Sequence, residues 1–199
     1  MSGGRKLEFD KQQALEAAMH VFWKKGFGGA SLSDLTHSMG INKPSMYATF
    51  GNKEALFVQA TEHYLENFAK SHCHFLCQEN TPLKARLKNY LMSVLSGQCD
   101  ESKPKGCYIT LCVSEAEGDS IPESALAKIT EASQYSYHNL TTLFQEDTEA
   151  RQLGLNIDAE ANACFLMTVL NGTAAMARAG LNLKQLEPVL DRALKGLGL

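Results

Sequence analysis

The sequence of 199 residues lacks the features of a membrane or secreted protein. No uninterrupted apolar run approaches the roughly 20 residues that a helix needs to cross a bilayer. The N-terminal residues 1–6 are not followed by the apolar stretch of a secretion signal. We therefore expect a cytoplasmic protein that has no membrane partner.

Disulfide and phosphate-binding motifs are missing as well. The six cysteines include no Cys-x-x-Cys pair and no regular spacing, so we expect reduced and mostly buried thiols. The glycine-containing turn at 26–29 follows an expected helix rather than a strand, which argues against a phosphate-binding loop. Strand-like alternation is nearly absent, and no internal repeat or low-complexity segment is found. The content of 44% apolar and 21% charged residues is that of an ordinary globular protein. Together with the lack of strand patterns, the helical spacing of the apolar residues predicts an all-α fold.

Negative charge is in slight excess overall, but it is unevenly distributed. The formal net charge is −3. Residues 1–53 hold seven basic residues, among them Arg5 and Lys6, and four acidic ones, a net charge of +3 that leaves −6 for the remainder. This asymmetry suits a small DNA-contacting head on an acidic body.

Helical patterns occur along the whole chain. Asp10 is suited to cap a first helix, whose apolar residues Leu15, Ala18, Met19 and Phe22 recur at helical spacing and which Gly26 ends. Further helices are expected over 33–39, 42–50, 52–77, from 82, over 107–117, 122–153, 158–179 and 183–197. The stretch 98–106 is expected to be a loop. A strand remains possible at the start of 107–117, where Tyr108-Ile109-Thr110 favours one.

Residues 31–56 carry the strongest functional signal. A short amphipathic helix is broken at Gly40, and Asn42 is suited to cap a second short helix that tolerates Pro44 in its first turn. The apolar residues are spaced to pack these two helices onto the first. In a helix-turn-helix, a first helix supports two further helices that are joined by a tight turn. The last of these helices presents short polar side chains to DNA. The alternative is a helical hairpin with no role in DNA binding.

Residues 10–57 resemble the N-terminal DNA-binding domain of the TetR family of transcriptional regulators. The residues that match are 14–22, Gly26-Phe27, 31–35, 40–43, 45–47, Phe50 and 53–57. The resemblance covers about a quarter of the chain, and the rest is similar to the family only in length and helical order. It implies a three-helix helix-turn-helix head at 1–52 and a larger helical domain for ligand binding and dimerisation at 53–199.

The resemblance also implies which residues contact double-stranded DNA. It makes 43–50 the recognition helix and assigns contacts with bases or phosphates to Ser31, Ser33, Lys43, Ser45, Tyr47, Thr49 and Lys53. Met46 and Phe50 are expected in the core. Ala48 departs from the family pattern, because many members carry a larger polar or aromatic residue there. Its methyl group can only contact a thymine methyl.

For the body, the resemblance implies a homodimer that reads a near-palindromic operator and is released from it by a small-molecule inducer. The last two helices are the dimer candidates, with small residues over 171–180 and the apolar residues Leu166, Leu170, Leu183, Leu186, Val189, Leu190 and Leu194. These residues can equally pack within one subunit. We expect a ligand cavity among the central helices, with candidate lining residues Phe68, Tyr90, Cys107, Tyr108, Tyr135, Tyr137, His138 and Phe165.

Cys107 offers an alternative trigger. It follows Gly106 at the start of an expected helix, where N–H groups lower a thiol pKa, and Lys103 and Lys105 would act in the same direction. A Gly-Cys at this point also resembles a TetR subgroup that includes regulators sensing electrophiles through such a cysteine. The same dipeptide can equally serve packing.

Two further interpretations complete the alternatives. His72-Cys73-His74 with Cys77 places thiol and imidazole groups together, which suits zinc or copper, although a four-ligand site needs further donors. A cysteine-dependent enzyme would need a base and an oxyanion site, and no organised nucleophile motif is present. We therefore expect a repressor that is not an enzyme and that has no metal or other cofactor.

Overall fold

The computed structural model describes residues 9–116 and 121–199, and every regular element in those ranges is helical. This confirms the all-α fold. The helices are α1 (Lys11–Gly29), α2 (Leu32–Met39), α3 (Lys43–Phe50), α4 (Lys53–Tyr64), α5 (Lys70–His72), α6 (Leu83–Cys99), α7 (Tyr108–Ala116), α8 (Glu123–Glu146), α9 (Thr148–Gln152), α10 (Ala159–Arg178) and α11 (Leu183–Gly196). Arg5, Lys6 and the expected end of α7 at Glu117 lie outside the described residues. No described helix is long and apolar enough to cross a membrane.

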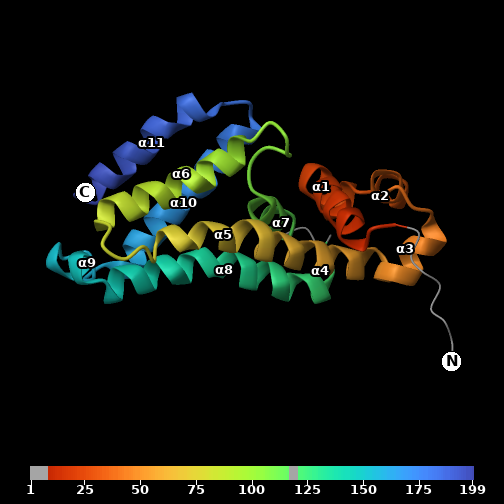
Figure 1. Cartoon of the computed structure of the whole chain (residues 1–199), viewed down its shortest axis with the longest axis horizontal. Helices are drawn as coiled ribbons and strands as arrows, with labels where there is room; N and C mark the ends of the chain where they lie inside the picture. The colour runs from red at the N-terminus through yellow and green to blue at the C-terminus, as the bar shows by residue number, and fades with distance from the viewer. Residues whose placement is uncertain (1–8, 117–120) are drawn as a thin grey trace.

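Side-chain caps fix where the N-terminal helices begin. The Asp10 carboxylate accepts a hydrogen bond from the Gln12 N–H at 2.8 Å, and Ser31 and Asp34 form a reciprocal capping box on α2. Asn42 and Asn52 cap α3 and α4 through their Oδ1 atoms. Figure 1 shows α1, α2 and α3 gathered at one end of the molecule, opposite the C-terminus.

The first helix is kinked where the sequence indicated its end. Gly26 has φ +73° and ψ 177°, outside the helical region, and a short helical turn follows it up to Gly29. A Cβ atom at Gly26 would lie 1.8 Å from Oε1 of Glu115, at the end of α7. Glycine is therefore needed here both for its backbone conformation and for the close approach of α7.

The expected helix at 52–77 is a continuous but irregular helical path. After α4, residues Leu65–Ala69 form a π-helical turn, α5 adds three residues, and Cys73–Phe75 form a 3₁₀ turn. This path leads from the head into the body beside α8 (Figure 1). Such π turns shift the side chains that follow them around the helix axis.

Two other expectations about the body can be compared with the structure. Residues from Tyr108 onward form helix α7, so the strand alternative is wrong. The helix expected from Pro122 to Leu153 is divided, because α8 ends at Glu146 and Asp147 then caps α9 by accepting a hydrogen bond from the Ala150 N–H at 3.0 Å. Asp147 also pairs with Arg86 of α6 at 2.6 Å, and both side chains are largely buried. The break therefore positions a carboxylate that joins α6 to the α8–α9 corner.

Buried residues form two core clusters. One joins the head to α4, α7 and the first half of α8, and it includes Phe22, Phe57 and Tyr108. The other lies among α6, α8, α10 and α11, and it includes Leu91, Phe144 and Leu190. The head thus shares its core with α4, α7 and α8, and α1 is in direct contact with α4 and α7, which border the cavity described below.

Candidate nucleic-acid interface and ligand cavity

One face of helix α3 packs into the core of the protein, and the opposite face is exposed to solvent. Met46 and Phe50 are buried, at 0% and 2% exposure, which confirms them as core residues. Gly40, with φ +65°, makes the turn between α2 and α3. Because this turn and the two buried anchors fix both ends of α3, its outer face is held rigidly at the surface.

The outer face of α3 carries short polar and basic side chains. Lys43 and Ala48 are exposed, Tyr47 is 47% exposed, and Ser45 and Thr49 are half-buried. Such a helix can enter a DNA major groove, where lysine and hydroxyl groups reach phosphates and base edges. The exposed Ala48 leaves space on this face and can make only an apolar contact.

Two of the three remaining candidate DNA contacts, Ser31 and Lys53, already interact with other groups of the protein. The Ser31 hydroxyl donates a hydrogen bond to Asp34 at 2.7 Å, and Asp34 also pairs with Lys25 at 2.6 Å. These bonds, led by that from Lys25, hold the pKa of Asp34 far below its usual value. The Lys53 ammonium lies 4.4 Å from the centroid of the Phe27 ring, and partial burial lowers its pKa. Ser33 is exposed.

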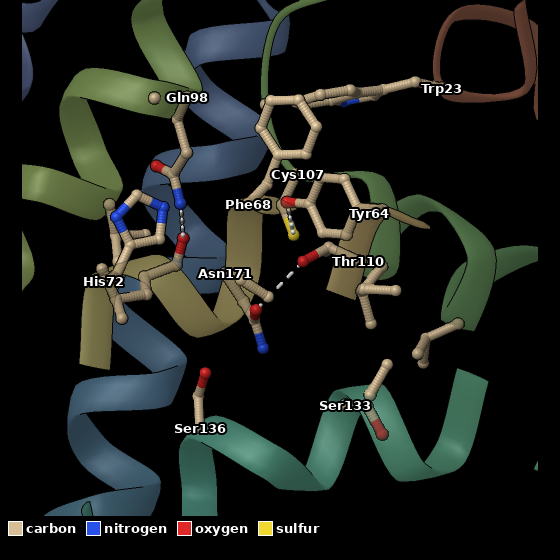
Figure 2. Close-up of a pocket in the computed structure, with 18 of the residues that line it drawn as sticks. Trp23, Tyr64, Phe68, His72, Gln98, Cys107, Thr110, Ser133, Ser136 and Asn171 are labelled. Atoms are coloured by element: carbon tan, nitrogen blue, oxygen red, sulfur yellow. Dashed lines mark hydrogen bonds between the residues drawn. The ribbon is translucent and has the colours of Figure 1, made fainter. Parts of the chain in front are cut away.

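A cavity of about 400 Å³ lies where α4, α5, α6, α7, α8 and α10 meet. Figure 2 shows Trp23, Tyr64 and Phe68 on one side and Ser133 and Ser136 of α8 on the opposite side. The rings form a packed set: Trp23 meets Tyr64 edge to face at 5.1 Å between centroids, and Tyr64 stacks on Phe68 at 5.5 Å. A concave, largely apolar site with a few polar groups has the character of a small-molecule pocket.

Comparisons with known proteins agree with this architecture. A family model described as bacterial regulatory proteins of the tetR family matches residues 14–60. The HTH-type transcriptional repressor BdcR of Escherichia coli (strain K12) is 30% identical over 183 residues, which cover 92% of this chain and 86% of that protein. The chain belongs to the TetR family.

Two further relatives match this chain over at least nine-tenths of their own length. The HTH-type transcriptional repressor ComR of Escherichia coli (strain K12) is 29% identical over 198 residues, 98% of this chain and 91% of ComR. A solved structure of the TetR family regulator CifR, a cysteine mutant in complex with 26-bp double-stranded operator DNA, is 30% identical. It covers 96% of this chain and 98% of CifR, with a TM-score of 0.82. The likeness therefore includes the body as well as the head.

Of the candidate ligand residues, the structure places Phe68, Tyr90 and Cys107 on the cavity wall. Tyr108 is fully buried beside it, with its hydroxyl 2.9 Å from Thr61 Oγ1. Tyr135 and Tyr137 are half-buried, His138 is exposed, Phe165 is 41% exposed, and none of these four lines the cavity. The sequence placed these residues on the central helices but did not show which side of each helix faces the cavity.

Several residues that line this cavity were not found from the sequence. Trp23 belongs to α1 of the head, and Asn171 lies on α10, yet both reach the same cavity. Thr110 of α7 donates a hydrogen bond to Asn171 Oδ1 at 3.1 Å (Figure 2). The buried Gln98 donates to the Leu170 carbonyl and accepts from Thr173, so its amide serves the fold. Only the single tryptophan of the chain, in the middle of an apolar helix face, offered a signal.

Cys107 immediately precedes α7 and lines the cavity. Its Sγ lies 3.6 Å from the Tyr64 hydroxyl (Figure 2). Burial and the neighbouring Cys107 raise the pKa of Tyr64, so this hydroxyl stays protonated. The contacts given for the two nearby lysines do not involve the Cys107 thiol: Lys105 Nζ donates to the Cys99 carbonyl at 2.6 Å, and Lys103 Nζ lies over the Phe68 ring.

The histidines and cysteines at 72–77 do not converge. Nδ1 of His72 is 2.7 Å from the Ser93 hydroxyl, His74 bonds the Ser71 carbonyl, and Cys77 is exposed. Cys73 is buried, and this burial raises its pKa to about 11. Across residues 9–116 and 121–199, no group of three potential metal ligands is found. These residues are therefore neighbours in sequence but do not form a three-ligand cluster in the described part of the structure.

Proposed function

We propose that this protein is a homodimeric transcriptional repressor that binds a near-palindromic DNA operator and is released by a small molecule. The observation that carries the proposal is the outward face of α3, with Lys43 and Tyr47 exposed above two buried anchors. The whole-chain relatives ComR and BdcR bear the name of repressors, and CifR was solved with operator DNA. The same face is therefore the surface that would enter the major groove.

The exposure of each candidate side chain indicates how it would contact DNA. Lys43 and Tyr47 would reach phosphates or base edges, and Ser45 and Thr49 would contact the groove from half-buried positions. Ser33, near the N-terminal end of α2, would contact a phosphate. Ser31 would contribute chiefly by holding the first turn of α2, because its hydroxyl already bonds Asp34. Lys53 would approach a phosphate from its position over Phe27.

The proposed dimer interface is the outer surface of α10 and α11. On these helices Phe165, Met176 and Val189 are 41%, 46% and 40% exposed. The other apolar candidates are largely turned inward, since Leu166, Leu170, Leu186, Leu190 and Leu194 are buried within the chain. Each helix can thus serve the core with one face and a partner subunit with the other.

Release would begin in the cavity. Trp23 of α1 and the first turn of α7 both line it, so a bound molecule touches the head directly. A ligand shifts the equilibrium only by its difference in affinity for the DNA-bound and released arrangements. An occupant that requires Trp23 to move would favour the arrangement in which the two α3 helices no longer fit successive major grooves.

A gel shift tests the DNA-binding proposal. The probe is the protein's own upstream DNA at a stated salt concentration, with a scrambled duplex of equal length as competitor. We expect specific retardation by the parent protein and a large loss in the Lys43→Ala/Tyr47→Phe variant. Lys84→Ala, which removes an exposed lysine from α6, outside the proposed dimer interface, is the control and should bind as the parent does. An absence of specific retardation by the parent protein would contradict the proposal.

A further inference from the structure

The described side chains that line the cavity include a basic residue and no acidic one. Among the residues that line it within 9–116 and 121–199, Lys103 alone carries a full charge, and none is aspartate or glutamate. Burial is the main cause of the lowered pKa of His72, and Lys103 contributes to the same shift, so the imidazole is mainly neutral near pH 7. A ligand in this cavity therefore meets one ammonium group and no carboxylate from the lining residues.

Lys103 is placed to accept a second partner. Its Nζ lies 4.9 Å from the centroid of the Phe68 ring and 3.3 Å from Oδ2 of Asp100. This ion pair is longer than the 2.7–2.9 Å that is usual for a charge-assisted hydrogen bond. Asp100 is also held by Ser102, whose N–H and hydroxyl donate to Oδ1 at 2.9 and 2.7 Å. Asp100 thus stays with its own loop, and Lys103 keeps donors for another anion.

Helix α7 adds positive potential to the same cavity. The lining residues Gly106, Cys107, Ile109 and Thr110 come from its N-terminal end. The N-terminus of a helix carries the positive end of its dipole and favours a nearby anion. Asn171 accepts the Thr110 hydroxyl through Oδ1, so its amide nitrogen remains a donor, and Figure 2 shows this nitrogen in the space between α7 and α8.

The rest of the lining is suited to a flat apolar body. Trp23, Tyr64, Phe68 and Tyr90 contribute aromatic rings, and Val94, Ile109, Val113, Met167 and Leu170 contribute aliphatic surface. Aromatic side chains favour stacked or edge-on contacts with another ring. The volume of about 400 Å³ accommodates a molecule of two fused rings with room for a substituent.

We propose that the cavity binds an aromatic monocarboxylate, with the carboxylate held by Lys103 and the rings packed among the aromatic and aliphatic side chains. The identity of this molecule as the inducer rests on the function proposed above. The binding of this molecule to the cavity does not depend on the proposed function, because binding is measured without DNA.

The charged groups at the cavity disfavour cationic and neutral ligands relative to an anion. A cationic molecule would lose its hydration and meet Lys103 and the positive end of α7 without a carboxylate among the lining residues. A neutral analogue can make the same ring contacts but forgoes the pairing with Lys103. Because Lys103 is partly exposed, with 30% of its side-chain area accessible, we expect a moderate preference rather than an absolute one.

Three probes with the same ring system test the proposal. Isothermal titration of the full chain without DNA compares 2-naphthoate, 2-naphthamide and protonated 2-naphthylmethylamine, which carry charges of minus one, zero and plus one. We expect 2-naphthoate to bind about tenfold or more tightly than the amide, and the amine to bind most weakly. Equal or tighter binding of the amide would overturn the proposal, as would no binding of 2-naphthoate up to about 1 mM.

Two lysine variants locate the charge that is responsible. Lys103→Gln should reduce the preference for 2-naphthoate over 2-naphthamide to about twofold or less. Lys105→Gln is the matched control from the same loop, because Lys105 Nζ is turned to the Cys99 carbonyl, and it should keep the preference. A preference that survives in Lys103→Gln would overturn the assignment. If the parent protein binds its operator but does not bind 2-naphthoate, this inference is contradicted. The proposed repressor function is not affected by that result.

Discussion

The carboxylate of Glu115 accepts a hydrogen bond from the backbone N–H of Phe27 at 2.8 Å, although the two residues are 88 positions apart. Glu115 lies near the end of α7, whose first turn lines the cavity. Phe27 follows the kink in α1, and its ring lies under the Lys53 ammonium at the start of α4. Helix α7 therefore borders the ligand cavity and, next to the lining residue Ser114, bonds the backbone of α1.

This contact predicts a coupling between cavity and head that depends on Glu115. Glu115→Ala should lower the free energy of unfolding by about 1–2 kcal/mol, because the Phe27 N–H loses its partner. It should also reduce the effect of a bound ligand on operator affinity. Glu115→Gln keeps an oxygen acceptor and should restore most of both quantities. Urea denaturation and ligand titrations of a fluorescent operator measure them, and an alanine variant with unchanged ligand response would refute the coupling.

A second prediction concerns Lys43 and salt. If its ammonium contacts a phosphate, Lys43→Ala should weaken operator binding about uniformly across sequences and reduce the salt slope by about one unit per half-site. Fluorescence anisotropy over a range of salt concentrations gives the slope. Lys84→Ala, on α6, should leave the slope unchanged. A slope equal to that of the parent would remove Lys43 from the set of phosphate contacts.

Two histidines predict how stability depends on pH. Burial is the main cause of the lowered pKa of both His20 and His72, from the ordinary value of 6.5. The unfolded chain then binds more protons than the native chain below that value, so stability is full above pH 6.5 and falls as the pH decreases toward the native pKa values. Urea denaturation between about pH 7.5 and 5.5 should show this loss. His72→Gln should lessen the pH dependence, whereas exposed His138→Gln should not.

The alternative of a thiol trigger leads to a prediction for Cys107. If alkylation inside the cavity causes release, Cys107→Ser should keep operator affinity and lose the release caused by N-ethylmaleimide. Because Cys164 is exposed outside the cavity, Cys164→Ser should still be released and serves as the control. Mass spectrometry reports which thiol has reacted. Release of the Cys107→Ser variant at the parental reagent concentration would exclude this trigger.

The proposed dimer surface can be tested without disturbing the core. Phe165→Glu and Val189→Glu place charges on side chains that are already 41% and 40% exposed. We expect both variants to keep their helical circular dichroism and to shift from dimer toward monomer in sedimentation velocity experiments, because an apolar interface does not accommodate unpaired charges. Ile157→Glu, at a side chain that is 79% exposed near α9, should remain as dimeric as the parent. Dimers in the first two variants would place the interface elsewhere.

Local chemistry made the head predictable. Asp10, Asn42 and Asn52 each bond an N–H group within the next three residues, so the helix starts follow from the sequence alone. The division of the expected helix at 122–153 was missed because Asp147 acts both as a cap and as the partner of Arg86, far away in sequence. The irregular turn at Leu65–Ala69 was missed for a similar reason, since the residue pattern there is compatible with a regular helix.

The sequence by itself determined that this chain is all-α, that it carries a helix-turn-helix head, and that Met46 and Phe50 anchor α3. Each of these depends on the order and spacing of neighbouring residues. Only the tertiary structure decided that Trp23, Lys103 and Asn171 share one cavity and that Phe165 and His138 do not belong to it. Helical spacing defines a face of each helix, but the angles at which helices pack decide where that face points.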